Sequence, residues 1–482
     1  MDVSLDTQYA RLHAALAGPS GMYDRAAILG FAMAARRAAR TDLGIALLDK
    51  YLTRMSEDRE VQFGYAQLRY ESGLPAAQRF AAQLRHMPDD PRLIAATAAA
   101  RAAEGEPANA EALLESALAK RPDWIDGHKS LAALRWQQGA AIDAFADSFR
   151  IACAAQPQNR GLWLAWFHAM AQAKAWAAAH AVITQAESCM GEHIGFSLAK
   201  LYLASESGDD QVADRLFQQV SDAQDVGLDL CRVRFGLKHG RLEWAERAAL
   251  RLLATPAASN AWPYLSLIWR LNNDARAQWL DAPDETIKVY DLPMSLAEIG
   301  ELRALLAALH TNRSPNLDQS VRGGTQTDRQ LFYRHEPIIA VLKAKVQSAV
   351  TDYITALPPP DPQHPLLGMA RTSAPYFTGS WSVRLSASGF HVAHTHPMGS
   401  ISSAFYVALP ALDPADPTTA GWISFGTPPA ELGLALKPYQ FIAPQVGRLV
   451  LFPSTMWHST ETFNVGERLV VAFDLAVPRG AA

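Results

Sequence analysis

Residues 102–122, "AAEGEPANAEALLESALAKRP", have the composition of two helices joined by a short turn. Gly105 stands in the turn, and Ala110 and Leu114, four residues apart, lie on one face of the segment that follows. A small residue such as Ala110 lets the second helix approach the first closely. Pro122 ends the second helix, because proline has no backbone N–H for the next hydrogen bond. The stretch therefore predicts a helical hairpin.

Similar polar breaks recur through the Ala- and Leu-rich part of the chain. They fall at Thr41, Gly73, Gly105, Gly139, Lys174, Gly208 and Gly240, with spacings of 32, 32, 34, 35, 34 and 32 residues. An alanine stands five residues after six of the seven breaks, at Ala46, Ala110, Ala144, Ala179, Ala213 and Ala245. This pattern resembles the 34-residue period of tetratricopeptide repeats over roughly residues 9–275. A generic helical bundle is the alternative interpretation.

The composition changes after Trp279. Residues 287–309 predict a strand followed by a helix, and residues 336–357 predict a second helix, which ends at a proline cluster. Short apolar segments separated by Gly, Pro and Asn then follow at 380–386, 390–396, 401–409, 421–425, 439–444, 447–454 and 468–477. Such segments favour a β-sandwich or a jelly-roll barrel, which encloses a cavity.

The expected fold class is therefore α+β multidomain. We expect an N-terminal all-α, tetratricopeptide-like solenoid at residues 1–279. A C-terminal double-stranded β-helix, or jelly-roll, domain is expected at residues 280–482.

Composition and charge exclude several classes of protein. The net charge is −4 and no block of Lys and Arg stands out, so we expect no nucleic-acid partner. The N-terminus lacks a signal-peptide pattern, and no apolar run is long enough to span a membrane. The three cysteines are odd in number and far apart. They fit a reducing compartment, so we expect the protein to be cytoplasmic.

The most informative polar residues are histidines. His391, His394 and His396 lie within six residues, although the whole chain has only 14 histidines. Residues two apart in a strand share a face, so His394 and His396 should point the same way, and His391 should face outward if the strand is regular there. His458 follows the segment 447–454, and Arg468 comes ten residues later.

Two ligands close together and one distant histidine can hold a single metal ion in a double-stranded β-helix. In non-haem Fe(II) oxygenases the first pair is His-x-Asp or His-x-Glu, and three metal positions stay open. Here the pair is His-x-His. Three neutral imidazoles leave the ion with its full charge, which favours a dianionic co-substrate. Arg468 could bind the remote carboxylate of that co-substrate.

At this point the sequence resembles a known family. The segments "QSVRGGTQTDRQLF", "GFHVAHTHPMGSISSAFYVALP" and "GRLVLFPSTMWHST" are similar to those of bacterial putative 2-oxoglutarate/Fe(II)-dependent oxygenases fused to tetratricopeptide repeats. The resemblance covers about residues 285–478. It implies a jelly-roll oxygenase domain that uses Fe(II), 2-oxoglutarate and O2. It also implies His394, His396 and His458 as metal ligands, and Arg468 as the residue that holds the distal carboxylate of 2-oxoglutarate.

Other residues near these motifs have two interpretations each. Tyr406 could bind 2-oxoglutarate or simply pack inside the barrel. Arg384 could line the cavity and bind the co-substrate, or form a surface ion pair. Asp474 is the one nearby strand carboxylate that could replace a histidine as ligand. Gly323 and Gly324 would permit a tight turn.

The expected function is 2-oxoglutarate- and Fe(II)-dependent hydroxylation. Because repeat solenoids grip extended peptides, the expected partner is a peptide or protein substrate recruited by the repeats. Two alternatives remain: a three-histidine cupin-type dioxygenase that does not use 2-oxoglutarate, and a non-enzymatic scaffold with a degenerate barrel.

Overall fold

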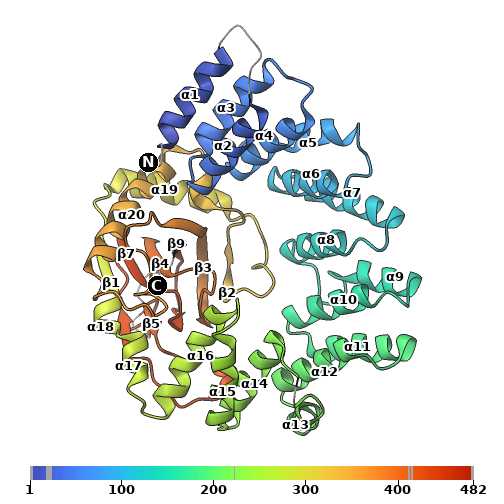
Figure 1. Cartoon of the computed structure of the whole chain (residues 1–482), viewed down its shortest axis with the longest axis vertical. Helices are drawn as coiled ribbons and strands as arrows, with labels where there is room; N and C mark the ends of the chain where they lie inside the picture. The colour runs from blue at the N-terminus through green and yellow to red at the C-terminus, as the bar shows by residue number, and fades with distance from the viewer. Residues whose placement is uncertain (1–3, 18–23, 222, 411–412, 414–415, 479–482) are drawn as a thin grey trace. The chain divides into compact units, whose positions relative to one another are not determined.

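The computed structural model describes residues 4–17, 24–221, 223–410, 413 and 416–478 (Figure 1). The chain forms two compact units. One consists of residues 1–135 and 328–344, and the other of residues 136–327 and 345–482. Among the described residues, no helix has the length and apolar character needed to cross a membrane.

Helices make up the first part of the chain. They are α1 (Leu5–Ala17), α2 (Arg25–Arg37), α3 (Thr41–Leu52), α4 (Arg59–Glu71), α5 (Ala77–Leu84), α6 (Pro91–Ala103), α7 (Pro107–Lys120), α8 (Ile125–Gln137), α9 (Asp147–Ala155), α10 (Arg160–Gln172), α11 (Trp176–Met190), α12 (Ile194–Ser207), α13 (Asp210–Gln219), α14 (Val226–Lys238), α15 (Leu242–Leu252), α16 (Ala258–Leu271), α17 (Arg276–Asp281) and α18 (Pro283–Thr286).

Within the described part of the chain, α2 to α17 follow one another as eight pairs of helices. The connection within each pair contains a residue with a positive φ angle: Ala39, Gly73, Gly105, Gly139, Lys174, Gly208, Gly240 and Asn273. The predicted helical-repeat solenoid is confirmed. The first break lies at Ala39 rather than at the predicted Thr41, which instead begins α3. The last break, at Asn273, was not predicted.

The alanine after each break packs as expected in four hairpins. Ala110, Ala179, Ala213 and Ala245 are completely buried. Ala46 and Ala144 are exposed, so the prediction is wrong for these two. In the first hairpin the small residue at the contact between helices is Gly44, five residues after Ala39. A Cβ at Gly44 would lie 2.8 Å from the Leu68 side chain.

The residues of unit 1 that follow the repeats in sequence pack against its first helices. Thr41 donates a hydrogen bond from Oγ1 to the Tyr333 carbonyl, at 2.7 Å. Arg329 donates to the Tyr70 carbonyl, at 2.6 Å. Segment 328–344 therefore belongs to this unit although it is far away in sequence.

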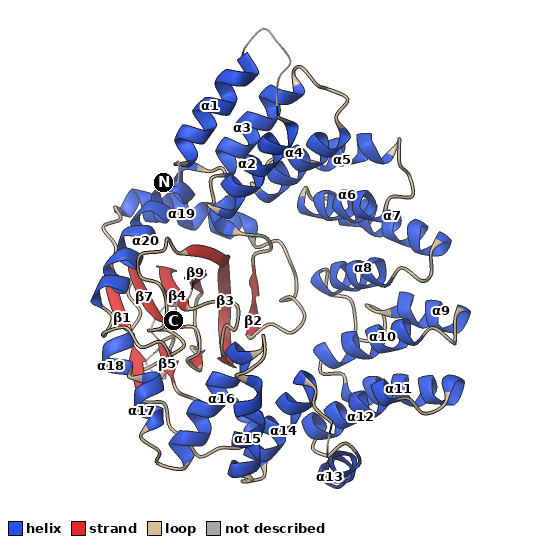
Figure 2. Ribbon diagram, viewed as in Figure 1, coloured by secondary structure: helices blue, strands red, loops and turns tan. Residues whose placement is uncertain are grey.

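The second unit contains the sheet (Figure 2). Its strands are β1 (Lys288–Asp291), β2 (Val321–Gln326), β3 (Tyr376–His394), β4 (Ile401–Ala408), β5 (Ile423–Phe425), β6 (Gln440–Ile442), β7 (Arg448–Pro453), β8 (His458–Thr460) and β9 (Arg468–Ala476). The second unit also contains α19 (Leu296–Leu309) and η2 (Ala430–Leu432). Of the other elements, η1 (Leu331–Tyr333) lies in the first unit, and α20 (Pro337–Ala356) begins in the first unit and ends in the second.

The described strands form one antiparallel sheet in the order β1-β7-β4-β9-β3-β8-β5-β6, with β2 paired to β3. The sheet curls as the predicted jelly-roll does. All eight residues of β4 are buried, so this strand lies in the core on both faces. Strands β2 and β8 were not predicted, because they are short and poor in apolar residues.

The long strand β3 turns the sheet. Its first part, Tyr376 to Leu385, pairs with β9, while His391 and His394 pair with β8. Between the two parts Ser388 has a φ angle of 63°, and its N–H donates to the Phe463 carbonyl. β3 therefore changes its partner strand at this bend, and its end is directed toward β8.

Gly323 and Gly324 lie inside β2 and not in a tight turn, so that prediction is wrong. A Cβ on Gly323 would lie 2.9 Å from the Cα of Gly389 in β3. The glycines are needed because the two backbones approach closely at the irregular pairing of β2 with β3.

Helix α16 shares a hydrophobic core with the end of the sheet. Leu265 and Ile268 of this helix cluster with Leu432 and Trp457. Arg270 donates to the carbonyls of Gly426 and Lys437, at 2.6 and 2.7 Å. The division at residue 280 separates helices from strands and stays a prediction about domain organisation. By compactness, the later repeats and the sheet form one unit.

Candidate metal centre

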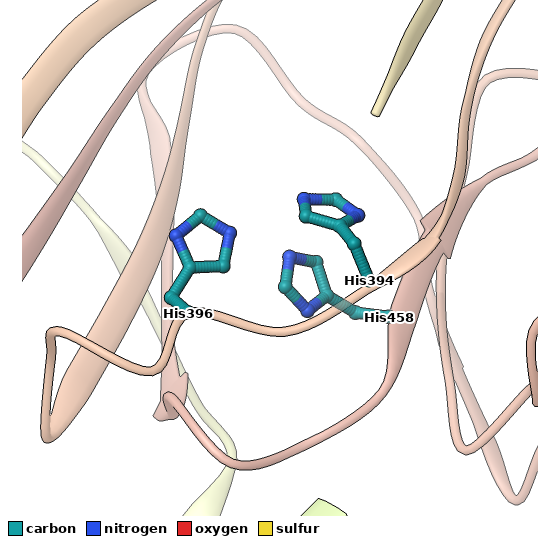
Figure 3. Close-up of side chains that lie close together, drawn as sticks. All are labelled: His394, His396 and His458. Atoms are coloured by element: carbon teal, nitrogen blue, oxygen red, sulfur yellow. The ribbon is translucent and has the colours of Figure 1, made fainter. Parts of the chain in front are cut away.

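Three histidines gather in one place (Figure 3). His394 ends β3 and is paired with His458, which begins β8, while His396 lies in the loop after β3. The ring centroids of His394 and His458 are 4.2 Å apart, and that of His396 lies 5.0 and 5.1 Å from them. One ring nitrogen of each histidine lies within 4.8 Å of the others. The structure thus brings together the three predicted metal ligands.

Hydrogen bonds determine which ring nitrogen is available. His394 Nδ1 lies 2.9 Å from the Val392 carbonyl, and His458 Nδ1 lies 3.0 Å from the Met456 carbonyl. A carbonyl only accepts, so Nδ1 carries the proton and Nε2 keeps its lone pair. The Nε2 of His396 is buried and has no hydrogen-bond partner among the described residues. A buried polar nitrogen of this kind fits a metal ion.

Two of the three histidines, His394 and His458, are held in the neutral form. Burial lowers the pKa of His394 to about 3, and it lowers the pKa of His458 well below its ordinary value. The neighbouring imidazoles act in the same direction, because a proton on one ring repels a proton on the next. Neutral imidazole is the form that binds a divalent metal, so no proton must leave when the ion enters.

The histidines line a cavity of about 350 Å³. Trp381 stacks on His396, with ring centroids 5.5 Å apart and planes 8° from parallel. Phe452 packs edge-on against His458, at 4.7 Å. The volume is that of a small-molecule site, and these aromatic side chains restrict how the two imidazoles can turn.

Arg468 lies in the wall of the same cavity. It is only 2% exposed, and its Nε donates to the Gly421 carbonyl, at 3.1 Å. Its guanidinium lies over the Tyr406 ring, 5.0 Å from the centroid. No carboxylate forms an ion pair with Arg468 in the part of the chain that the structure describes. A buried cation without an anionic partner is costly and fits a site for an anionic ligand.

Tyr406 is completely buried, in a core cluster with Val450, Phe452 and Val470. Its hydroxyl interacts with the Arg468 guanidinium, which also lies over its ring. Tyr406 is not among the residues that line the cavity, so it packs in the barrel and supports Arg468 from behind.

Arg384 does not line the cavity. Its Nε donates to a Glu467 carboxylate oxygen at 2.8 Å, its side chain is 41% exposed, and Arg303 donates to the other oxygen. The predicted role of Arg384 in binding a cofactor is therefore not supported. The surface ion pair, which was the alternative, is what the structure contains.

His391 faces the cavity and not outward, so the prediction from strand parity is wrong. The pairing of β3 with β8 shifts between His391 and His394, and a bulge of this kind changes which face a side chain occupies. His391 Nδ1 lies 3.0 Å from Thr460 Oγ1. His391 is not among the three histidines whose nitrogens converge.

Asp474, in β9, lies behind His396. Its Oδ2 accepts a hydrogen bond from His396 Nδ1 at 2.7 Å, and its Oδ1 accepts one from Ser402 Oγ at 2.6 Å. The sequence left open that Asp474 replaces a histidine as ligand. Both of its oxygens have donors, and it does not belong to the converging group.

Sequence reasoning missed the wall and rim of the cavity. Trp381, earlier in β3, stacks on His396, and Thr460 contacts His391 from β8. Residues 318–320 reach the cavity from the loop before β2. None of these positions has a local signal. Only the register of β3 with its neighbours places them at the site.

Fold and site together define a helical-repeat solenoid joined to a jelly-roll domain with a three-histidine cluster. Residues 379–474 match the family model described as "Putative 2OG-Fe(II) oxygenase". The match confirms, for this part of the chain, the resemblance drawn from the sequence motifs. No curated protein matches the chain.

Several solved structures are similar to parts of the chain. A tetratricopeptide repeat protein from Parabacteroides merdae is 13% identical, with 48% of this chain and 88% of that chain covered and a TM-score of 0.33. A Pseudomonas putida prolyl-4-hydroxylase is 16% identical, with 41% and 94% covered and a TM-score of 0.27. HygX from Streptomyces hygroscopicus, solved with nickel, 2-oxoglutarate and hygromycin B, is 14% identical, with 40% and 84% covered and a TM-score of 0.27. These likenesses are weak, and none of them bears on the activity of this chain.

Proposed function

We propose that this protein is a 2-oxoglutarate- and Fe(II)-dependent oxygenase in which His394, His396 and His458 hold the iron. One observation carries the proposal: a buried guanidinium without an anionic partner, Arg468, lines the same cavity as the three converging imidazoles. A cation site and a metal site in one cavity suit a ligand with two carboxylates, and 2-oxoglutarate is such a ligand.

Each group in the cavity has a distinct task in this proposal. The three imidazoles would bind the metal through Nε2. Arg468 would pair with the distal carboxylate of 2-oxoglutarate in a charge-assisted contact, and Tyr406, against which the guanidinium packs, would hold Arg468 in place. Trp381 and the buried apolar wall would keep water away from the reacting atoms.

Iron, 2-oxoglutarate and O2 would together supply the oxidant: one oxygen atom enters a C–H bond of the substrate, and the other enters succinate as CO2 leaves. The protein's part is to hold these reactants in one orientation. A set of three neutral ligands suits this co-substrate, because the dianion compensates the full charge of the ion.

The substrate is proposed to be a side chain of a peptide or protein, recruited by the helical repeats. Helical-repeat solenoids commonly bind extended chains along one surface. A cytoplasmic location is part of the proposal, since the three cysteines are unpaired.

Production of succinate tests the proposed activity. Anaerobic protein loaded with one equivalent of Fe(II) should convert 2-oxoglutarate to succinate when O2 is admitted, slowly alone and faster with peptides from a cell extract. A three-histidine dioxygenase that does not use 2-oxoglutarate would consume O2 without forming succinate. Metal binding without consumption of either compound would identify a non-enzymatic scaffold.

A further inference from the structure

We infer that Asp474 is a positioning residue for the metal, because it orients the ring of the ligand His396. Acting through that imidazole, it also supplies the negative charge that a carboxylate ligand provides directly in His-x-Asp sites. The inference rests on the proposed function, because it concerns the same metal. It assigns a role to a residue that the three-histidine set leaves out.

His396 needs an external anchor more than the other two histidines do. His394 and His458 are paired with each other across β3 and β8. His396 lies beyond the end of β3, where its backbone N–H donates to the Ser454 carbonyl at 3.0 Å. Asp474 belongs to β9, which is paired on both sides, with β3 and with β4. The carboxylate thus ties a ring on a loop to a central strand.

The hydrogen bond also selects the form of the ring. A carboxylate oxygen accepts the hydrogen bond from Nδ1 of His396, so Nε2 is the ring nitrogen that remains to bind a metal. This is the Nε2 that is buried without a partner. Carboxylates that accept a hydrogen bond from a metal-bound histidine fix its tautomer and make it a stronger ligand.

The charge of Asp474 is otherwise uncompensated. Its side chain is 8% exposed, and in the described part of the chain neither Lys nor Arg forms an ion pair with it. Its partners are an imidazole and the Ser402 hydroxyl. Burying a carboxylate with only an imidazole and a hydroxyl as partners is unfavourable, whereas a divalent ion on the far side of the imidazole offsets the cost.

The loop that carries His396 is packed directly onto this carboxylate. A Cβ on Gly399 would lie 2.6 Å from Ser454 Oγ and 3.1 Å from the Asp474 Cβ. Trp381 stacks on the His396 ring. The ring is therefore held by the stack, by the carboxylate and by its backbone.

Titration of the full-length protein with Fe(II) and with Co(II), under anaerobic conditions, tests the inference. Asp474→Asn keeps the size of the side chain and removes its charge, and we expect about 10- to 100-fold weaker metal binding. The visible spectrum of bound Co(II) should change as well, because the geometry at His396 relaxes. Unchanged affinity and spectrum would overturn the inference.

Asp281→Asn is the matched control. Asp281 is likewise buried and accepts a hydrogen bond from a serine, Ser266, at 2.7 Å, but it does not line the cavity. We expect its metal affinity to equal that of the wild type. If both variants weaken metal binding equally, loss of any buried carboxylate explains the effect and the inference is wrong.

A second background separates positioning from a general structural role. His396→Ala removes the imidazole that Asp474 contacts, so nothing is left for the carboxylate to orient. Asp474→Asn should therefore weaken metal binding clearly in the wild type and much less in the His396→Ala background. Equal weakening in both backgrounds would show that Asp474 only supports the fold.

A third variant keeps the inference testable if Asp474→Asn does not fold. Ser402→Ala removes a donor to Asp474 while keeping its charge, and it should weaken metal binding at least threefold; an unchanged affinity would contradict the inference. Metal binding by the wild-type protein separates failure of the proposed function from failure of the inference about Asp474. If it binds no divalent metal, the proposed function itself fails, whereas tight binding that is equal in all variants refutes only the role of Asp474.

Discussion

The indole N–H of Trp457 donates a hydrogen bond to the carbonyl of Pro263, over 2.9 Å. Trp457 directly precedes the candidate ligand His458, and Pro263 lies inside α16, in the last hairpin of the repeats. The two residues are 194 positions apart in sequence. The metal centre is therefore supported by a helix of the repeat region, which the division into helices and strands did not suggest.

A fragment that begins at Asp281 should consequently fail to fold. It would expose the face of Trp457 and Leu432 that packs on Leu265 and Ile268 in the intact chain. We expect aggregation in gel filtration and loss of metal binding. A monomeric fragment with the metal affinity of the full chain would show that α16 is dispensable.

Replacement of the three converging histidines should abolish metal binding. His394→Ala, His396→Ala and His458→Ala each leave two ligands, which is an incomplete site. His391→Ala should change the affinity for Fe(II) by less than about tenfold, since that ring contacts Thr460 and lies outside the converging group. Anaerobic iron titration compares the four variants. An equal loss at His391 and His394 would mean that the ligand set differs.

Arg468→Ala should raise the KM for 2-oxoglutarate by tens to thousands of times while leaving Fe(II) affinity nearly unchanged. Loss of a buried, charge-assisted contact costs about 2–5 kcal/mol. Arg468→Lys should recover part of it, because an ammonium lacks the planar two-pronged geometry.

The matched control for Arg468 is Arg384→Ala, which removes a partly exposed arginine of the neighbouring strand. Its KM for 2-oxoglutarate should stay at the wild-type value. If both variants behave alike, or if Arg468→Ala lowers only the melting temperature, Arg468 does not bind the co-substrate.

The buried carboxyl of Asp281 should make the free energy of unfolding depend on pH. Burial raises the pKa of this carboxyl to about 6 from its ordinary value of 3.8. The folded protein then holds the proton more tightly than the unfolded chain, so the stabilising contribution is full below pH 4 and is lost as pH rises through 6. The loss amounts to ~3 kcal/mol.

Asp281→Asn should remove this contribution to the pH dependence. Chemical denaturation at pH 4 and pH 8 measures it: the variant should gain stability relative to the wild type at pH 8 only. A constant difference between the two proteins at both pH values would mean that Asp281 does not hold its proton in the folded state.

The parts of the account that came from sequence rest on local or periodic patterns. Glycines at Gly73, Gly105, Gly139, Gly208 and Gly240 mark hairpin turns because each has a positive φ angle, which glycine adopts without strain. Ala39 adopts the same conformation without any local signal, so the first break was misplaced. The spacing of His394, His396 and His458 was sufficient to predict that they converge.

What the sequence could not predict depends on strand register. The bulge before His394 brings His391 into the cavity, and nothing in the residues around it indicates an extra position. Asp474 contacts His396 across 78 residues, through the pairing of two distant strands. Arg384 is less buried than its neighbours Val383 and Leu385, as expected for side chains that alternate along a strand. The alternation does not tell which face of the strand borders the cavity.

The most direct measurement is anomalous diffraction from crystals grown without oxygen in the presence of Fe(II) and 2-oxoglutarate. The account predicts one iron peak bonded to Nε2 of His394, His396 and His458, with the distal carboxylate of 2-oxoglutarate on Arg468. An iron bound directly by Asp474, or 2-oxoglutarate away from Arg468, would contradict it.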